Sequence, residues 1–172
     1  MNAKKWVVFD LIGVLAEPSW RDLVPEESEY LERWNLLRKG CLAEQAFWTE
    51  RMQDLYRSLL AFRPARLELV RALKRQGYEI AIATNFSSGW LDKLLGSLSG
   101  SDRELFSGFV VSDREGVAKP DEEFFARVKR FAPAGSVFID DRLANCDAAR
   151  RAGYRAIWAH PGVELEREIA AA

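Results

Sequence analysis

The sequence has very little cysteine or histidine. It contains two cysteines, Cys41 and Cys146, and one histidine, His160, among 172 residues. Two cysteines make neither a disulfide framework nor a zinc site. We therefore expect both to be small, buried and reduced, as in a cytoplasmic protein. His160 follows the last predicted strand, where a surface or loop position is expected.

The sequence also lacks an excess of one charge and any long apolar run. It has 25 Lys and Arg against 26 Asp and Glu, a net charge of −1. No overall basic field is therefore present to attract nucleic acid. The start, Met1–Ala16, loosely resembles a secretion signal, but Asp10 interrupts its apolar run. No segment is long and apolar enough to span a bilayer, so we expect neither a nucleic acid nor a membrane as partner.

Short apolar strands alternate with amphipathic helices over most of the chain. The predicted strands are Trp6–Leu11, Glu79–Thr84, Phe109–Ser112, Ser136–Asp140 and Arg155–Trp158. The predicted helices between them are Pro64–Gln76, Asp121–Phe131 and Ala144–Ala152. This alternation indicates an α/β fold, a Rossmann-like parallel sheet flanked by helices, because parallel strands need crossover connections.

One connection is too long for a simple crossover. Residues 16–62 leave the first strand without reaching the next, and two amphipathic helices fit there, Glu26–Lys39 and Leu42–Leu60. Their apolar faces predict a helical hairpin. We expect residues 1–15 and 63–172 to form the core domain, and residues 16–62 to form a small α-helical cap over the carboxyl edge of the sheet.

Polar residues fall where predicted strands end or the next helix begins. These residues are Asp10, Thr84, Asn85, Lys119, Asp140 and Asp141. The carboxyl ends of parallel strands form the ligand crevice of an open α/β sheet, so these side chains should meet at one edge.

Their chemical types are consistent with phosphoryl chemistry. Crowded carboxylates at Asp10, Asp140 and Asp141 would repel one another unless a hard cation such as Mg²⁺ joined them. Lys119 adds a positive charge, and the Thr84–Asn85 pair offers donors to phosphoryl oxygens. An aspartate can also act as a nucleophile and form an aspartyl-phosphate.

In this order the motifs resemble those of the haloacid dehalogenase (HAD)-like hydrolase superfamily, subfamily I, which carries a small helical cap. The four motifs are Phe9-Asp10-Leu11-Ile12-Gly13-Val14-Leu15, Ala83-Thr84-Asn85, Val117-Ala118-Lys119-Pro120-Asp121 and Phe138-Ile139-Asp140-Asp141. Together they cover nearly the whole chain. The resemblance implies a magnesium-dependent phosphatase that acts on a small phosphorylated molecule.

The same resemblance assigns roles to these residues. Asp10 would be the nucleophile and a metal ligand, and the backbone carbonyl of Ile12 would be a second ligand. Thr84 and Asn85 would bind the phosphate, and Lys119 would orient the nucleophile and the phosphate. Asp140, Asp141 or both would hold Mg²⁺.

Ile12 departs from the phosphatase pattern. The family's phosphatases usually carry an aspartate at this position, two residues after the nucleophile, where it protonates the leaving oxygen. Isoleucine cannot transfer a proton, and loss of general acid–base help costs typically ~10²–10⁴ in rate. Three interpretations remain open: a phosphatase that favours good leaving groups, a non-catalytic binding or regulatory domain, and a 2-haloacid dehalogenase. Dehalogenases need no metal and usually lose the acidic pair, which this sequence retains.

Overall fold

A parallel sheet of five strands forms the centre of the molecule. The computed structural model describes residues 4–18, 28–48 and 50–172. The strands lie in the order β5 (Phe106–Val111), β4 (Tyr78–Thr84), β1 (Lys5–Phe9), β6 (Val137–Asp140) and β7 (Arg155–Trp158). Every neighbouring pair is parallel. The predicted α/β class and parallel sheet are therefore confirmed, with strand bounds that differ by one to three residues at most ends.

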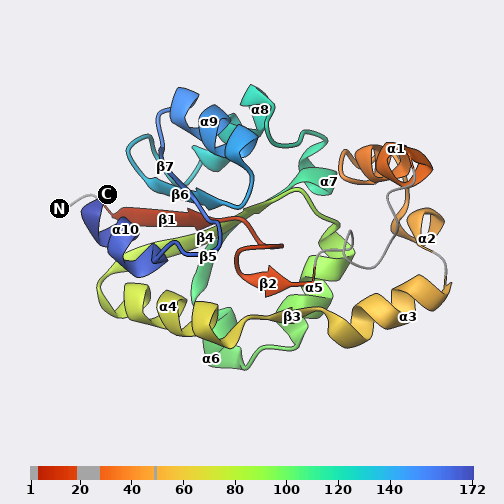
Figure 1. Cartoon of the computed structure of the whole chain (residues 1–172), viewed down its shortest axis with the longest axis horizontal. Helices are drawn as coiled ribbons and strands as arrows, with labels where there is room; N and C mark the ends of the chain where they lie inside the picture. The colour runs from red at the N-terminus through yellow and green to blue at the C-terminus, as the bar shows by residue number, and fades with distance from the viewer. Residues whose placement is uncertain (1–3, 19–27, 49) are drawn as a thin grey trace.

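The central strand β1 is apolar on both sides because helices cover both faces of the sheet. Val7 and Phe9 belong to one buried cluster, and Val8 belongs to another. The first cluster receives α4 (Pro64–Arg75), α5 (Ser88–Gly96) and α10 (Leu165–Ala171). The second receives α8 (Glu122–Val128) and α9 (Leu143–Arg151). Figure 1 shows α8 and α9 on one side of the sheet and α4 and α10 on the other.

Between the first strand of the main sheet and α4, the described residues form three helices. They are α1 (Ser28–Leu37), α2 (Glu44–Phe47) and α3 (Glu50–Leu59). A short ribbon of β2 (Ala16–Glu17) and β3 (Ala61–Phe62) joins the two ends of this segment in antiparallel pairing. These residues are the ones for which a cap is predicted, and the division into core and cap stays a prediction. Residues 26 and 27 of the first predicted helix lie outside the described residues. Two further short helices are α6 (Gly100–Arg103) and α7 (Ser112–Glu115).

The prediction of one helix over Leu42–Leu60 is wrong, because the chain turns out of the helix at Trp48. This residue is extended, with φ −91° and ψ 139°. Its ring packs edge-on against Phe47 at 4.8 Å, stacks on Tyr56 at 5.0 Å and contacts Trp90 of α5 at 5.7 Å. Burying one indole among three aromatic rings outweighs the continuous helical pattern. The same contacts join the inserted helices to the core domain.

The two cysteines and the single histidine lie in different environments. Cys146 is buried, as expected, but Cys41 is exposed, so the expectation of two buried thiols is wrong. Cys41 follows α1 in a turn closed by Gly40, which leaves its side chain outside both apolar clusters. His160 is exposed beyond β7, and its ring lies tilted against that of Trp158, with the centroids 4.4 Å apart. Within the described residues, no helix has the length and apolar character needed to cross a bilayer.

Candidate active site

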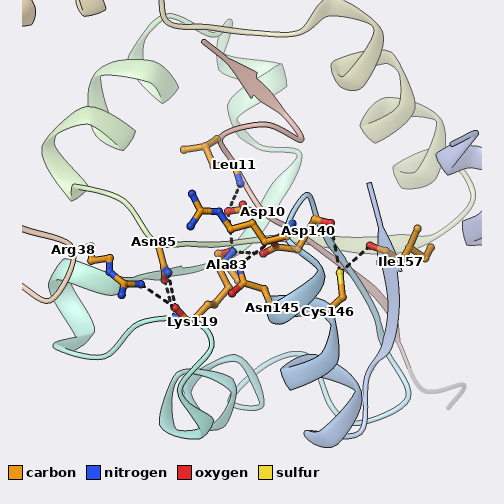
Figure 2. Close-up of polar contacts among 11 residues, drawn as sticks. Asp10, Leu11, Arg38, Ala83, Asn85, Lys119, Asp140, Asn145, Cys146 and Ile157 are labelled. Atoms are coloured by element: carbon orange, nitrogen blue, oxygen red, sulfur yellow. Dashed lines mark hydrogen bonds and ion pairs between the residues drawn. The ribbon is translucent and has the colours of Figure 1, made fainter. Parts of the chain in front are cut away.

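The polar residues predicted from strand ends meet at the carboxyl edge of the sheet. Phe9 of β1 pairs with Ile82 of β4 and with Ile139 of β6. This register brings Asp10, just after β1, beside Asp140 at the end of β6. Figure 2 shows these side chains converging on Lys119, which precedes α8.

Lys119 is buried at the centre of the group and uses all three of its ammonium protons. Its Nζ lies 2.9 Å from Asp10 Oδ1 and 2.6 Å from Asp140 Oδ2, and it donates to the carbonyl of Ala83 at 2.8 Å. Burial opposes the charged form, but attraction to Asp10 and Asp140 outweighs it and raises the pKa of Lys119. Lys119 therefore stays positively charged beside Asp10, and all three of its ammonium protons already have acceptors.

Asn85 holds the backbone of Lys119 in place. Its Nδ2 donates to the Lys119 carbonyl at 2.8 Å, and its Oδ1 accepts from the Lys119 amide at 2.8 Å. The role expected for Asn85 was phosphate binding. These contacts give its carboxamide a positioning role as well, and only one Nδ2 proton remains for another acceptor. Thr84, at the end of β4, is nearly buried and lines the cavity beside Asp10.

Asp140 and Asp141 are adjacent in sequence but have different partners. Asp140 is fully buried, and besides Lys119 it accepts from the Arg142 amide and from Asn145 Nδ2, both at 2.9 Å. Asp141 Oδ1 is also buried, but it has no hydrogen-bond donor among the described residues. Because buried carboxylate oxygens are normally paired, this orphaned atom indicates a missing partner. Asn145 follows the fourth motif of the resemblance in sequence, but no role at the site was predicted for it.

Gly13 allows Asp141 to approach the loop after β1. Its φ is +90°, and an added Cβ would lie 2.5 Å from Asp141 Oδ2. Any side chain here would therefore be strained and would displace the carboxylate.

The acidic cluster carries more negative charge than Lys119 can offset. Asp10, Asp140 and Asp141 each offer an oxygen, and these oxygens lie within 4.8 Å of one another. Burial raises the pKa of Asp10 to about 7, with Lys119 opposing the shift and Asp140 and Asp141 adding to it. Burial, and then Asp140, also raise the pKa of Asp141. With all three ionised and Lys119 charged, the net charge is −2, which a divalent cation would neutralise.

A small cavity of about 50 Å³ opens beside the nucleophile position. It is lined by Asp10, Ile12, Trp34, Thr84, Asn85, Phe86, Lys119, Asp141, Arg142 and Asn145. A buried water needs roughly 10–15 Å³ by this measure, so the cavity holds roughly three to five water-sized groups, about the size of one phosphoryl group. Trp34 comes from the inserted helix α1, and Phe86 follows β4. Neither was predicted as a site residue: Trp34 belongs to the apolar face of a predicted cap helix, and Phe86 was not singled out.

The lining of the cavity contains few groups that could donate a proton to a leaving group. Besides Asp10 and Asp141, no described residue that lines it carries a carboxylate, and Ile12 presents an alkyl chain. Among the described lining residues, the position where the resemblance predicts a general acid is therefore occupied by Ile12.

Comparisons with known proteins identify the family to which the chain is similar. A model of the haloacid dehalogenase-like hydrolase family matches residues 32–153. A sesquiterpene phosphatase, astK, from Aspergillus oryzae is 34% identical over 88 residues, which are 49% of this chain and 44% of that protein. This chain therefore spans less than half the length of that relative.

Two solved structures share the fold across nearly the whole chain. One is a HAD family enzyme from Bacteroides thetaiotaomicron in complex with magnesium and inorganic phosphate, with a TM-score of 0.71 and 18% identity over 96% of this chain and 99% of that one. Another is L-2-haloacid dehalogenase from Xanthobacter autotrophicus, with a TM-score of 0.68 and 19% identity over 98% of this chain and 83% of that one.

Proposed function

This chain belongs to the haloacid dehalogenase-like hydrolase family, and from that premise we propose that it is a Mg²⁺-dependent phosphatase of a small molecule. The observation that carries the proposal is the cluster of three carboxylates around one buried lysine, facing a cavity of phosphoryl size. The expected cytoplasmic location is part of the same proposal.

The side chains present are suited to Mg²⁺. The ion prefers oxygen ligands, and the cluster offers them with a net charge of −2. Asp10, Asp141 and the backbone carbonyl of Ile12 would hold the ion. Asp141 is favoured over Asp140 because its Oδ1 lacks a donor, whereas Asp140 already accepts from Lys119, Arg142 and Asn145. The bound ion would supply charge stabilisation to the phosphoryl oxygens.

Asp10 acts as the nucleophile in this proposal. Its Oδ1 is held by Lys119 and by the amide of Leu11, which donates at 2.8 Å. A carboxylate oxygen attacks phosphorus, the bond from phosphorus to the leaving oxygen breaks, and an aspartyl-phosphate forms. Water then releases inorganic phosphate and restores Asp10. Thr84 and Asn85 would bind the phosphoryl oxygens, and Lys119 would orient Asp10 and contribute its positive charge to the bound phosphate.

Ile12 restricts which substrates can be cleaved quickly. The leaving oxygen receives no proton from the protein, so substrates whose leaving group is stable as an anion are favoured. Aryl phosphates, acyl phosphates, anomeric sugar phosphates and phosphoanhydrides meet this condition. A dehalogenase is disfavoured by the retained pair Asp140 and Asp141, which that chemistry does not need.

The test is phosphate release from a mixed panel, with Mg²⁺ and with chelator. The panel contains aryl, acyl, sugar 1-phosphate and sugar 6-phosphate esters, and an isoprenoid phosphate because of the similarity to a sesquiterpene phosphatase. Asp10→Asn should abolish release. Asp147→Asn is the matched control, because Asp147 is exposed and pairs only with Arg150.

The outcomes separate the alternatives. Release that requires Mg²⁺ and Asp10, and that is fastest for good leaving groups, supports the proposal. No release from any substrate by a folded protein that still binds Mg²⁺ would favour a non-catalytic domain. Halide release from a 2-haloacid without Mg²⁺ would instead establish a dehalogenase.

A further inference from the structure

Arg38 lies at the edge of the site without an anionic partner. It is one helical turn after Trp34, and its amide donates to the Trp34 carbonyl at 2.9 Å. Its Nη1 donates to the Lys119 carbonyl at 3.0 Å, and its Nε donates to Asn35 Oδ1 at 2.9 Å (Figure 2 shows the contact with Lys119). Among the described residues, no carboxylate forms an ion pair with this half-buried guanidinium. The nearby Asp121 lies within 3.7 Å of Lys39 instead.

Arg142 approaches the same place from the other side of the site. Its amide is fixed by Asp140 Oδ1, and its side chain lines the cavity that contains Asp10. The residue is exposed, and within the described part of the chain its guanidinium has neither a hydrogen bond nor an ion pair.

The two guanidiniums are close enough to repel each other. Burial lowers the pKa of Arg38, and the positive charge of Arg142 lowers it further, whereas Asp121 opposes the shift. Asp121 acts on Arg38, and Arg142 acts on Asp141, but no described carboxylate forms an ion pair with either guanidinium, so a bound anion would relieve their repulsion. Planar guanidiniums are also the side chains best suited to bind phosphate through paired hydrogen bonds.

The size of the cavity determines which part of a substrate can contact Arg38 and Arg142. About 50 Å³ accommodates roughly one phosphoryl group beside Asp10. The next group of the substrate must then lie at the mouth, where Arg142 lines the cavity and Arg38 adjoins Lys119.

We propose that the substrate is a diphosphate ester, and that Arg38 and Arg142 bind the phosphate next to the one that is transferred. The inference rests on the proposed phosphatase function and narrows its substrate class. The oxygen of Asp10 attacks the terminal phosphorus, and the bond from that phosphorus to the bridging oxygen breaks. The electron pair stays on the bridging oxygen, which becomes part of the departing phosphate monoester. Water then hydrolyses the aspartyl-phosphate to inorganic phosphate.

This substrate class also explains Ile12. A phosphate monoester loses its second proton near pH 6, so it leaves as a stable dianion and needs no general acid. The two arginines neutralise the negative charge that develops on it.

The experiment compares a monophosphate and a diphosphate of the same alcohol. Geranyl phosphate against geranyl diphosphate, and AMP against ADP, form two such pairs. The wild type should cleave the terminal phosphate of the diphosphate with a kcat/KM at least tenfold above that of the monophosphate. Arg142→Gln and Arg38→Gln should each lower kcat/KM for the diphosphate by about ten- to a hundredfold, and lower it for the monophosphate by a clearly smaller factor. Arg151→Gln, an exposed arginine of α9, is the matched control.

A binding measurement keeps this inference separate from the proposed function. Calorimetry with the wild-type protein and Mg²⁺ would compare methylenediphosphonate, which cannot be hydrolysed, with inorganic phosphate. Tighter binding of the diphosphonate that is lost in Arg142→Gln supports the arginine site even if no ester is hydrolysed. Equal affinity for the two probes, or equal loss of activity on both members of a substrate pair, would overturn it. Failure of every ester with retained diphosphonate binding would refute only the phosphatase proposal.

Discussion

The neighbouring carboxylates Asp140 and Asp141 should respond in opposite ways to the same substitution. Asp140→Asn removes a buried charge that pairs with Lys119 and accepts from Arg142 and Asn145. Breaking a buried ion pair from one side costs about 3–5 kcal/mol, and the new amide cannot accept all these bonds. We expect the free energy of unfolding without metal to fall by about that amount.

Asp141→Asn removes a carboxylate whose Oδ1 accepts no hydrogen bond among the described residues. It also removes the repulsion from Asp140 that, after burial, raises the pKa of Asp141. The free energy of unfolding without metal should therefore stay within about 1 kcal/mol of the wild type, or rise.

The stabilisation of the folded protein by Mg²⁺, in contrast, should depend strongly on Asp141. Mg²⁺ at a hundred times its Kd stabilises the wild type by about 2.7 kcal/mol. If losing Asp141 weakens binding a hundredfold, the same concentration adds only about 0.4 kcal/mol by the same relation. The free energy of unfolding of Asp141→Asn should thus be close to that of the wild type in chelator and lower than that of the wild type in Mg²⁺.

Urea unfolding followed by tryptophan fluorescence, in EDTA and in MgCl₂ at fixed pH, measures both quantities. The reasoning would be refuted if Asp141→Asn lost as much stability in EDTA as Asp140→Asn did. It would also be refuted if Asp141→Asn kept the full stabilisation by Mg²⁺.

Three further predictions concern the same loop. Burial raises the pKa of Asp10 to about 7. Below that pH a proton must leave before Mg²⁺ binds, so the calorimetric affinity should rise about tenfold per pH unit from 5 to 7 and then level off; a flat profile would contradict this. In EDTA the folded protein holds this proton between about pH 4 and 7 while the unfolded chain does not, so the contribution of Asp10 to stability should fall as pH rises through that window. Gly13→Ala should destabilise the fold by more than about 1 kcal/mol and weaken Mg²⁺ binding, because its Cβ meets Asp141. Gly116→Ala should cost only backbone strain, since its φ is +68° and nothing lies within 4 Å of an added Cβ; equal effects of the two changes would refute this. Ile12→Asp should speed cleavage of alkyl phosphates by up to about 10² and leave phosphoanhydrides nearly unchanged, and a uniform change in kcat across both classes would argue against a missing general acid.

The sheet and the acidic group could be predicted because each depends on local features of the sequence. A run such as Trp6–Phe9 is apolar at every position, which indicates a strand covered on both faces. Asp10, Thr84 and Asp140 then come together because parallel strands end at one edge. The alternation of strands and helices in the sequence was sufficient to predict that these residues meet.

Other features depended on contacts between distant segments. The sequence predicts that Asn85 binds phosphate. Only the structure shows that its carboxamide is hydrogen-bonded to the backbone of Lys119. Trp48 ends a helical pattern early because Trp90, which is 42 residues away in sequence, offers it a buried partner. The different roles of Asp140 and Asp141 likewise depend on which oxygens already have donors.

In the proposed reaction, two features of this chain that are separate in sequence would impose the same requirement on the substrate. Ile12 stands where a general acid is expected, so the leaving group would have to be stable as an anion. Arg38 and Arg142, which form no ion pair with any described residue, place two positive charges beside the cavity, so the group next to the transferred phosphoryl should be an anion. An alkyl ester satisfies neither condition, and an aryl ester satisfies only the first. A phosphoanhydride satisfies both, because its leaving group is stable without a proton and carries the charge that the arginines lack. In such a substrate the chemistry of the leaving group and the electrostatics of the protein together replace the missing general acid.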